Sequence, residues 1–171
     1  MFYLSKNSKE TEKAAGVLAK EIIRKALSKR SALVLGLEGE LGAGKTTFVK
    51  GFARALGIKS KISSPTFVLM KAYRLKLKAY NNLCHIDAYR LKDHKDLARL
   101  GTREIFGSPE NIVLIEWSDR VKKILPKNYM KIHIDHINKT SRNISVKTST
   151  NASFLRRTNR RRTAKEAFAT V

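Results

Sequence analysis

The sequence predicts an α/β fold, and three observations lead to this class. A short apolar run, SALVLGL at residues 31–37, has the length and composition of a strand buried on both faces. A glycine-rich turn and then a helical stretch, TTFVKGFARAL, follow this run. A second apolar run, NIVLIEW at residues 111–117, has the same character as the first. A strand that leads through a glycine turn into a helix, with further strands later, is typical of α/β proteins.

Length and composition favour one domain. The chain has 171 residues, 42% of them hydrophobic, which suffices for one domain with a substantial core and not for two full domains. Cys84 is the only cysteine, so an internal disulfide and a secreted disulfide scaffold are excluded. No apolar run approaches the ~18 residues of a membrane span, and the first residues lack a basic-then-apolar secretion signal. We therefore expect a cytoplasmic protein with no membrane contact.

The first half of the chain contains two predicted helices with a strand between them. The first helix covers residues 8–29, where Asn7 or Ser8 can cap the N-terminus. Its apolar residues recur at helical spacing: Ala15, Leu18, Ile22 and Ala26. The strand at residues 31–37 follows. Gly57 ends the second helix in the usual C-terminal way.

The second half is predicted to be rich in strands. The expected strands lie at residues 66–71, 80–86, 111–117, 129–135 and 143–148, and a short helix is expected at 93–100. A lysine-rich stretch, RLKLK, separates the first two of these strands. We expect the folded domain to occupy residues 1–150.

The last 21 residues differ in character from the rest. Five arginines lie between Arg156 and Arg162, and the surrounding apolar residues are too few and scattered for a core. We predict that residues 151–171 form a basic tail, either flexible or helical only on a partner.

The formal net charge is +22, and the excess is spread along most of the chain. A protein this basic attracts polyanions without sequence preference. The charge can equally reflect a general preference for lysine in the source genome, so contact with nucleic acid stays an open alternative at this point.

The strongest signal is the segment GELGAGKT, from Gly39 to Thr46, which fits the phosphate-binding pattern G-x-x-x-x-G-K-[ST] without a mismatch. Its glycines allow the backbone to approach a phosphate closely, and its amides can form an anion nest at the start of the next helix. Lys45 can reach the β- and γ-phosphates, and Thr46 offers a hydroxyl to Mg²⁺. The N-K-x-D stretch of guanine-specific proteins is absent, because Asn138-Lys139 is followed by Thr140-Ser141. The sequence therefore favours ATP.

Three further segments carry polar residues at predicted strand ends. Ser64-Pro65-Thr66 begins a predicted strand after a turn and can bring a hydroxyl near the mouth of the loop, although the segment taken alone is better explained as an ordinary turn. Asp87 ends the strand of HIDAYR, where a phosphate-loop enzyme keeps its metal-side carboxylate, although a helix cap is an equal alternative. Glu116 ends NIVLIEW directly after buried apolar residues, and a carboxylate there is costly unless it is paired or near a metal. A functional role is therefore favoured for Glu116.

Four motifs, GELGAGKTTF, SPTF, HIDAYR and IEW, resemble those of the bacterial TsaE (YjeE) family in order and spacing, from about Ser8 to Val146. The resemblance implies a single-domain P-loop NTPase fold with a mixed β-sheet flanked by helices. It implies a slow, Mg²⁺-dependent ATPase that acts with two partner subunits, TsaB and TsaD. By this resemblance, these subunits transfer a threonylcarbamoyl group to the tRNA adenosine beside the anticodon, and the ATPase resets their complex between turnovers.

The resemblance also implies roles for individual residues. The implied catalytic residues are Lys45, Thr66, Asp87 and Glu116, with Asp87 as the Walker-B-like acid and Thr66 on a switch-like segment near the γ-phosphate. The implied nucleotide-binding residues are Thr11, Gly42, Ala43, Gly44, Lys45, Thr46, Thr47 and Arg142. The implied ligands of Mg²⁺ are Thr46 and Glu116. Thr47 can also be a neutral helix residue, and Trp117, which matches the family's aromatic residue after the glutamate, can equally serve core packing.

Two segments depart from the family pattern, the basic stretch from Arg74 to Lys78 and the tail. They keep open a second hypothesis, an RNA-binding module with a regulatory or vestigial ATP site that contacts tRNA through its basic surface and tail. A small-molecule kinase is a third and weaker hypothesis, because no lid-like stretch with several arginines occurs outside the tail.

Overall fold

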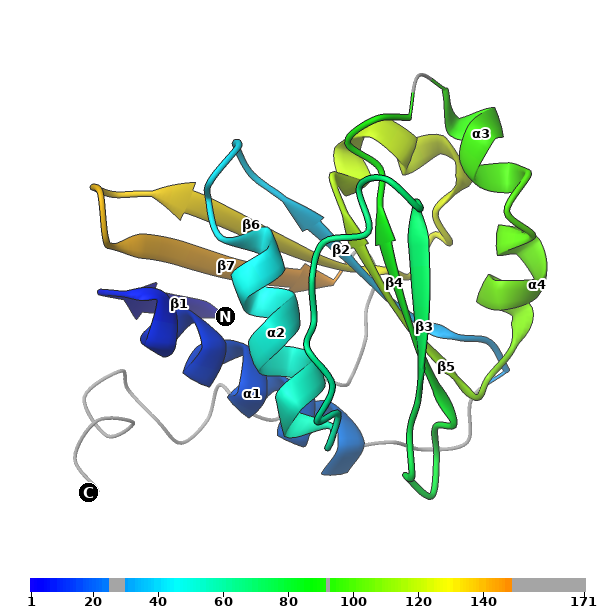
Figure 1. Ribbon diagram of the computed structural model, residues 1–171, viewed down its shortest axis with the longest axis horizontal. Coiled ribbons are helices and arrows are strands. Elements are labelled where there is room, and N and C mark those ends of the chain that lie inside the picture. The colour runs from blue at the N-terminus through cyan, green and yellow to red at the C-terminus, as the bar shows by residue number, and fades with distance from the viewer. Residues whose placement is uncertain (25–29, 92, 149–171) are drawn as a thin grey trace.

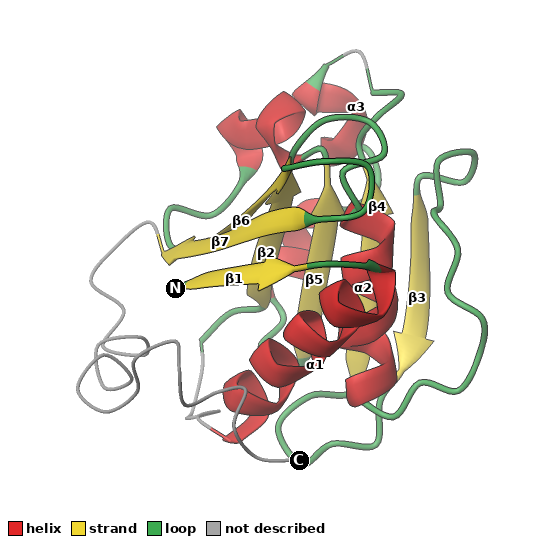
Figure 2. Cartoon of the chain, turned by 90° about the vertical axis from the view of Figure 1, so that its left-hand side faces the viewer, coloured by secondary structure: helices red, strands yellow, loops and turns green. Residues whose placement is uncertain are grey.

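The computed structural model describes all residues except 25–29, 92 and 149–171. The end of the first predicted helix and the whole predicted tail lie outside the described residues. The described chain forms one seven-stranded mixed sheet with helices on both faces, as Figures 1 and 2 show. This arrangement confirms the predicted α/β class.

The sheet has the strand order β1-β7-β6-β2-β5-β4-β3. Its strands are β1 (Phe2–Ser5), β2 (Leu33–Glu38), β3 (Met70–Arg74), β4 (Asn82–Asp87), β5 (Asn111–Glu116), β6 (Met130–His136) and β7 (Arg142–Thr148). The four central strands β6, β2, β5 and β4 are parallel, whereas β3, β7 and β1 each pair antiparallel with their neighbours. The carboxyl ends of the four parallel strands therefore meet at one edge of the sheet.

Helices cover the two faces unequally. The longer helices α1 (Ser8–Arg24) and α2 (Lys45–Ala55) pack side by side on one face (Figure 2). The short helices α3 (His94–Ala98) and α4 (Thr102–Gly107) and the 3-10 helix η1 (Ser118–Ile124) cover the other face. Each face has its own hydrophobic cluster, so the sheet is the middle layer of three.

Strand alternation decides which side chains reach the α2 face. On β5, Ile112 and Leu114 pack in the cluster beneath α1 and α2, and Val113 packs in the opposite cluster. Successive side chains of a strand point to opposite faces, so Glu116 lies on the α2 side. On β4, Leu83 belongs to the same cluster, which places Asp87 on that side too. Two carboxylates thus end adjacent strands on the face where α2 begins.

The contact between α1 and α2 depends on a glycine. A Cβ atom on Gly51 of α2 would lie 2.3 Å from the backbone oxygen of Glu12 on α1, a distance that real Cβ atoms do not show. The Arg54 guanidinium also pairs with the Glu12 carboxylate beside this crossing. Glycine inside a helix costs about 1 kcal/mol relative to alanine, so close packing of the two backbones explains its presence here.

We expect Gly51→Ala to lower the free energy of unfolding by about 1–3 kcal/mol, because the new methyl group pushes α1 away from α2. Urea denaturation followed by circular dichroism measures this change. Gly107→Ala is the matched control, since a Cβ there meets no atom within 4 Å and the backbone is not left-handed. A Gly51→Ala protein as stable as the parent would contradict the packing explanation.

The structure corrects several predicted boundaries. The strand expected at residues 66–71 is wrong for its first four residues, because the strand begins at Met70. The preceding residues form a turn in which the Pro65 carbonyl accepts hydrogen bonds from the amides of Val68 and Leu69, and Leu69 has a φ of 62°. Strand β1, helix α4 and helix η1 were not predicted. β1 exists by pairing with β7, nearly 140 residues away, which local pattern does not reveal.

Candidate functional site

The loop between β2 and α2 has the backbone conformation that its glycines predict. Gly39 has a φ of 136°, and a Cβ atom there would lie 2.2 Å from the carbonyl oxygen of Ile134 on β6. Gly44, with a φ of 105°, is the left-handed residue from which α2 starts. Side chains strongly disfavour these dihedral angles, so the loop depends on glycine at both positions.

Free backbone amides line the start of α2. The Phe48 amide donates to the Gly44 carbonyl at 2.8 Å, which is the first bond of the helix. The amides of Lys45, Thr46 and Thr47 precede that bond and have no acceptor within the described part of the chain. Unpaired amides at the positive end of a helix attract anions, phosphate above all.

Lys45 is folded against the loop. Its ammonium donates to the carbonyls of Gly39 at 2.7 Å and Glu40 at 2.8 Å. It also lies 3.6 Å from the centre of the Trp117 ring. The residue is only 4% exposed. Burial lowers the pKa of this lysine, while the nearby carboxylates of Glu116, Asp119 and Asp87 act to raise it. A desolvated ammonium held beside the amide nest is suited to a phosphate group.

Thr46, Glu116 and His85 form a chain of hydrogen bonds across the α2 side of the sheet. The Thr46 hydroxyl donates to both carboxylate oxygens of Glu116, at 3.0 and 2.8 Å. The same carboxylate is 2.8 Å from Nε2 of His85, and both side chains are buried. The carboxylate of Glu116 therefore faces the first turn of α2, and the imidazole of His85 holds it in this orientation.

Asp87 holds the segment that precedes β3. The hydroxyls of Ser64 and Thr66 each lie 2.5 Å from one oxygen of its carboxylate. The other oxygen accepts a hydrogen bond from the Tyr89 amide at 2.9 Å. Thr66 is thereby tied to the edge of the sheet at which the glycine loop lies, and Asp87 acts as the anchor of this segment.

The donor set fits Mg²⁺ together with a phosphate. No cluster of three or more His, Cys, Asp or Glu side chains suited to a metal ion occurs among the residues that the structure describes. Mg²⁺ does not need such a cage, because it usually takes one or two protein oxygens and completes its shell with phosphate and water. The Thr46 hydroxyl and the Glu116 carboxylate, within 3.0 Å of each other, supply such a pair.

Arg142, the first residue of β7, binds carbonyl oxygens of the glycine loop. Its Nε donates to the Ala43 carbonyl at 3.0 Å, and Nη2 lies 3.4 Å from the Gly42 carbonyl. Its Nη1 also donates to carbonyls of the β6–β7 turn: those of Asn138, Lys139 and Ser141. One guanidinium thus joins the β6–β7 hairpin to the loop through backbone oxygens.

Thr11 lies apart from these groups. It is buried on α1, where its hydroxyl is 2.9 Å from that of Ser5 and 3.4 Å from the Asn7 carbonyl. Within the described residues, no hydrogen bond joins it to the glycine loop. Thr47 lies half-buried in the first turn of α2, next to Thr46.

Trp117 leaves β5 in a strained conformation. Its φ of 59° is left-handed, which is rare for an aromatic residue. The ring lies 5.0 Å from that of Tyr89, and the Arg120 guanidinium is 5.4 Å from it. Strain of this kind is typical of functional sites. Here the ring lies beneath the Lys45 ammonium and also packs, half-buried, against the hydrophobic cluster on the α3 and α4 face of the sheet.

The sequence analysis assigned no role to His85, although this residue begins the HIDAYR motif. Its position two residues before Asp87 places it on the same face of β4, and β4 pairs with β5 in a register that sets Asp87 beside Glu116. The sequence could have indicated this placement, because alternate side chains of a strand point to the same face of the sheet. The contact with Glu116 depends on the strand pairing, which the sequence alone does not show.

A mixed sheet whose β2 strand passes through this glycine loop into α2 defines a P-loop NTPase fold. A crystal structure of Bacillus subtilis YdiB matches with a TM-score of 0.67 and 32% identity, covering 88% of this chain and 86% of that one. The family model described as threonylcarbamoyl adenosine biosynthesis protein TsaE matches residues 5–144. The chain belongs to the TsaE family.

Two similar proteins share the name tRNA threonylcarbamoyladenosine biosynthesis protein TsaE. The Haemophilus influenzae protein is 37% identical over 131 residues, which are 77% of this chain and 79% of that protein. The Bacillus subtilis protein is 40% identical over 112 residues, which are 66% of this chain and 67% of that protein. In the part of the chain that the structure describes, no helix has the length and hydropathy needed to span a bilayer.

Proposed function

We propose that this protein binds and hydrolyses ATP as a subunit required for the threonylcarbamoyl modification of the tRNA adenosine beside the anticodon. It acts in this role with TsaB and TsaD. Family membership supports the pathway. The observation that carries the ATPase proposal is the bond between Thr46, at the end of a complete phosphate loop, and the buried carboxylate of Glu116.

The proposal assigns a task to each group of residues. The amides at the start of α2 and the Lys45 ammonium bind the phosphates. Thr46 and Glu116 hold Mg²⁺, which offsets negative charge on the phosphates, and His85 keeps the Glu116 carboxylate oriented. Asp87 keeps Thr66 at the mouth of the site. Gly42, Ala43, Gly44 and Thr47 contribute backbone, and Arg142 keeps this backbone in place from behind.

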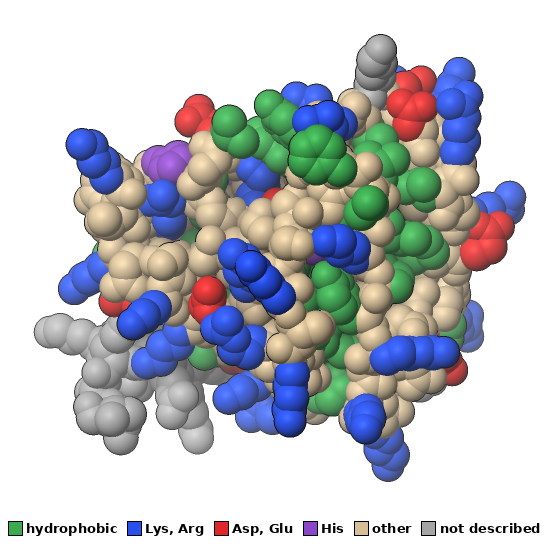
Figure 3. All heavy atoms as spheres, viewed as in Figure 1, with side chains coloured by type: hydrophobic (Ala, Val, Ile, Leu, Met, Phe, Trp, Pro, Cys, Tyr) green, Lys and Arg blue, Asp and Glu red, His purple; other side chains and the backbone are tan. Residues whose placement is uncertain are grey.

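Exposed apolar residues around the mouth of the site support a protein partner. Leu41 in the loop is 73% exposed, and Phe67 and Val68, just after Thr66, are 83% and 59% exposed. Figure 3 shows hydrophobic side chains gathered along the upper edge of the molecule, where the turn between β2 and α2 lies in Figure 1. Apolar side chains that gather at a functional edge commonly mark a binding surface. A partner seated there would contact both the loop and the segment held by Asp87.

The test is co-purification with the TsaB and TsaD proteins of the same organism, in the presence of ATP, ADP or no nucleotide, combined with a phosphate-release assay. We expect slow hydrolysis by the chain alone, and partner binding that changes with the nucleotide. Retention of tRNA without any hydrolysis, alone or with partners, would instead favour the RNA-binding module. A phosphorylated small molecule among the products would favour the kinase.

Arg142→Lys should weaken ATP affinity about tenfold. A lysine cannot reach the five carbonyls that the planar guanidinium contacts, so the loop loses its link to the β6–β7 hairpin and its preorganisation. Isothermal titration calorimetry measures the affinity, and hydrogen exchange of the amides at residues 41–47 reports the order of the loop. Arg99→Lys is the control, since Arg99 is exposed and pairs only with Asp96 among the described residues. If the amides at residues 41–47 exchanged hydrogen at the same rate in the Arg142→Lys protein as in the parent, Arg142 would have no role in ordering the loop.

A further inference from the structure

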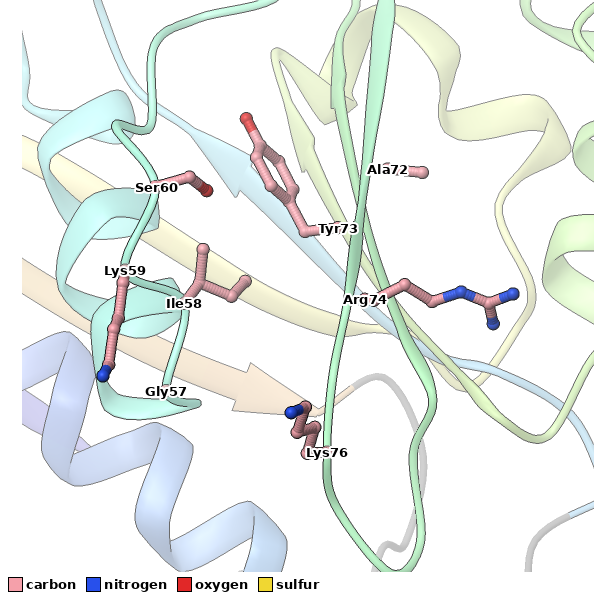
Figure 4. A pocket seen from close by; sticks show the side chains of 8 residues that line it. All are labelled: Gly57, Ile58, Lys59, Ser60, Ala72, Tyr73, Arg74 and Lys76. Carbon is pink, nitrogen blue, oxygen red and sulfur yellow. The ribbon is translucent and has the colours of Figure 1, made fainter.

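A hollow with a basic rim lies between the segment after α2 and the edge strand β3 (Figure 4). Its volume is about 630 Å³. It is lined by Gly57, Ile58, Lys59, Ser60, Ala72, Tyr73, Arg74 and Lys76. None of these residues is acidic, so the lining carries positive charge only.

The hollow has an apolar floor and a cationic rim. Ile58 and Tyr73 are half-buried and pack against the cluster beneath α1 and α2. Figure 4 shows their side chains between the two backbone segments, with Lys76 below them and Lys59 on the outer side of the segment after α2. The Arg74 side chain points across β3, where its Nη1 donates to the Asn82 side chain at 3.1 Å. Lys59 and Lys76 are the other two cationic residues of the lining.

The stretch RLKLK explains why the charge collects here. Leu75 is buried and Leu77 is half-buried in the core, while Arg74, Lys76 and Lys78 alternate with them and are exposed. Lys59 and Lys61, on the segment that follows α2, are exposed as well. Over the described ranges, none of these four lysines pairs with a carboxylate. Lysines that lie unpaired around a concave surface raise the local positive potential and attract a polyanion.

We propose that this surface, formed by Lys59, Lys61, Lys76 and Lys78 around the hollow, binds the phosphate backbone of RNA. The choice of tRNA as the ligand rests on the proposed function. Phosphate contacts from lysine are sequence-independent and add affinity through counterion release. A hollow of this size with an aromatic ring in its floor suits a strand with bases better than it suits a flat lipid surface.

The surface is separate from the ATP site. Helix α2 begins at the glycine loop and ends just before Gly57, so its 11 residues place about 16 Å between the two sites. Neutralising the lysines should therefore leave ATP hydrolysis unchanged, and RNA affinity can be measured without ATP or partner proteins. Failure of the ATPase proposal and failure of the RNA proposal are thus distinguishable.

The experiment compares two double variants of the full chain, each lacking two positive charges. Lys59→Gln/Lys76→Gln alters the rim, and Lys122→Gln/Lys123→Gln alters exposed residues of η1, on the opposite face of the sheet. Fluorescence anisotropy with labelled tRNA measures affinity over a salt series, and circular dichroism confirms folding. We expect the rim variant to lose at least about tenfold in affinity near 0.1 M salt. Its log–log salt slope should be shallower by roughly 1.4–1.8, whereas the control should change little.

Three outcomes would overturn the proposal. Equal losses in the two variants would show that the attraction belongs to the overall charge of +22. If the rim variant kept its affinity both for tRNA and for vesicles of anionic lipid, the remaining role for these lysines would be to protect the edge strand β3 from pairing with other chains. Loss of binding to vesicles of anionic lipid, with tRNA affinity unchanged, would assign the surface to a membrane.

Discussion

Lys45→Ala is expected to abolish useful ATP binding and, with it, hydrolysis. The alanine removes the ammonium that donates to the loop carbonyls beside the free amides of α2. A charge-assisted contact with phosphate contributes at least about 1.5–3 kcal/mol, which corresponds to a loss of roughly 10- to 150-fold in affinity. Titration calorimetry with Mg²⁺ and ATP measures the affinity, and the rise in melting temperature on adding ATP gives an independent readout.

The fold should survive this change. The Lys45 side chain bonds to loop carbonyls and stacks on Trp117, and it takes no part in either hydrophobic cluster. Lys50→Ala is the matched control, because Lys50 lies on the same helix about one turn further on. ATP affinity unchanged in the Lys45→Ala protein and equal to that of the control would rule out phosphate binding by this loop.

Glu116→Gln is expected to reduce hydrolysis on the order of 100-fold and to weaken its dependence on Mg²⁺, while ATP still binds. The amide has nearly the same shape as the carboxylate and can still contact Thr46 and His85, but it lacks the negative charge that a Mg²⁺ ligand requires. The amide nest and Lys45 remain, so phosphate binding persists. Phosphate release over a Mg²⁺ titration, together with an ATP-binding isotherm, separates the two effects.

Glu110→Gln provides the control for this variant. Glu110 lies just before the other end of β5, where its carboxylate accepts a hydrogen bond from the Asn81 side chain, and its replacement should leave hydrolysis unchanged. If Glu116→Gln were to lower stability while activity per folded molecule stayed the same, the buried carboxylate would have only a structural role.

Asp87→Asn should also lower hydrolysis, through a different contact. Asp87 accepts bonds from Ser64 and Thr66, so its replacement releases the segment at the mouth of the site as well as removing a charge. We expect Thr66→Val to reproduce part of the Asp87→Asn effect and none of the Mg²⁺ dependence seen with Glu116→Gln. The two carboxylates would then have separable roles.

Local patterns in the sequence sufficed for the loop and the central strands. The loop is continuous from Gly39 to Thr46, and its dihedral angles depend on its own glycines. The runs that became β2 and β5 are buried on both faces, so their apolar composition indicated them without any knowledge of neighbours. The family was identified from the same short motifs.

The edges of the sheet could not be predicted in this way. β1 pairs with β7, and its sequence, FYLS, is too short to carry a pattern of its own. The stretch after Ser64 contains the apolar residues of a strand, but hydrogen bonds to Asp87 and a turn at Pro65 delay the strand until Met70. In both places a contact with a distant residue outweighs local preference.

The amino-acid sequence was thus enough to specify the fold class, the phosphate loop and the residue types that end the strands. Which of these side chains meet depends on the folded chain. Thr46 and Glu116 are 70 residues apart and come into contact because β2 and β5 are parallel neighbours whose ends coincide. Arg142 lies 99 residues from Ala43 and reaches the loop from behind through the β6–β7 hairpin, while Thr11 turns toward Ser5. Strand order and register are properties of the whole sheet, and they are set by the combined packing of both faces rather than by any one segment.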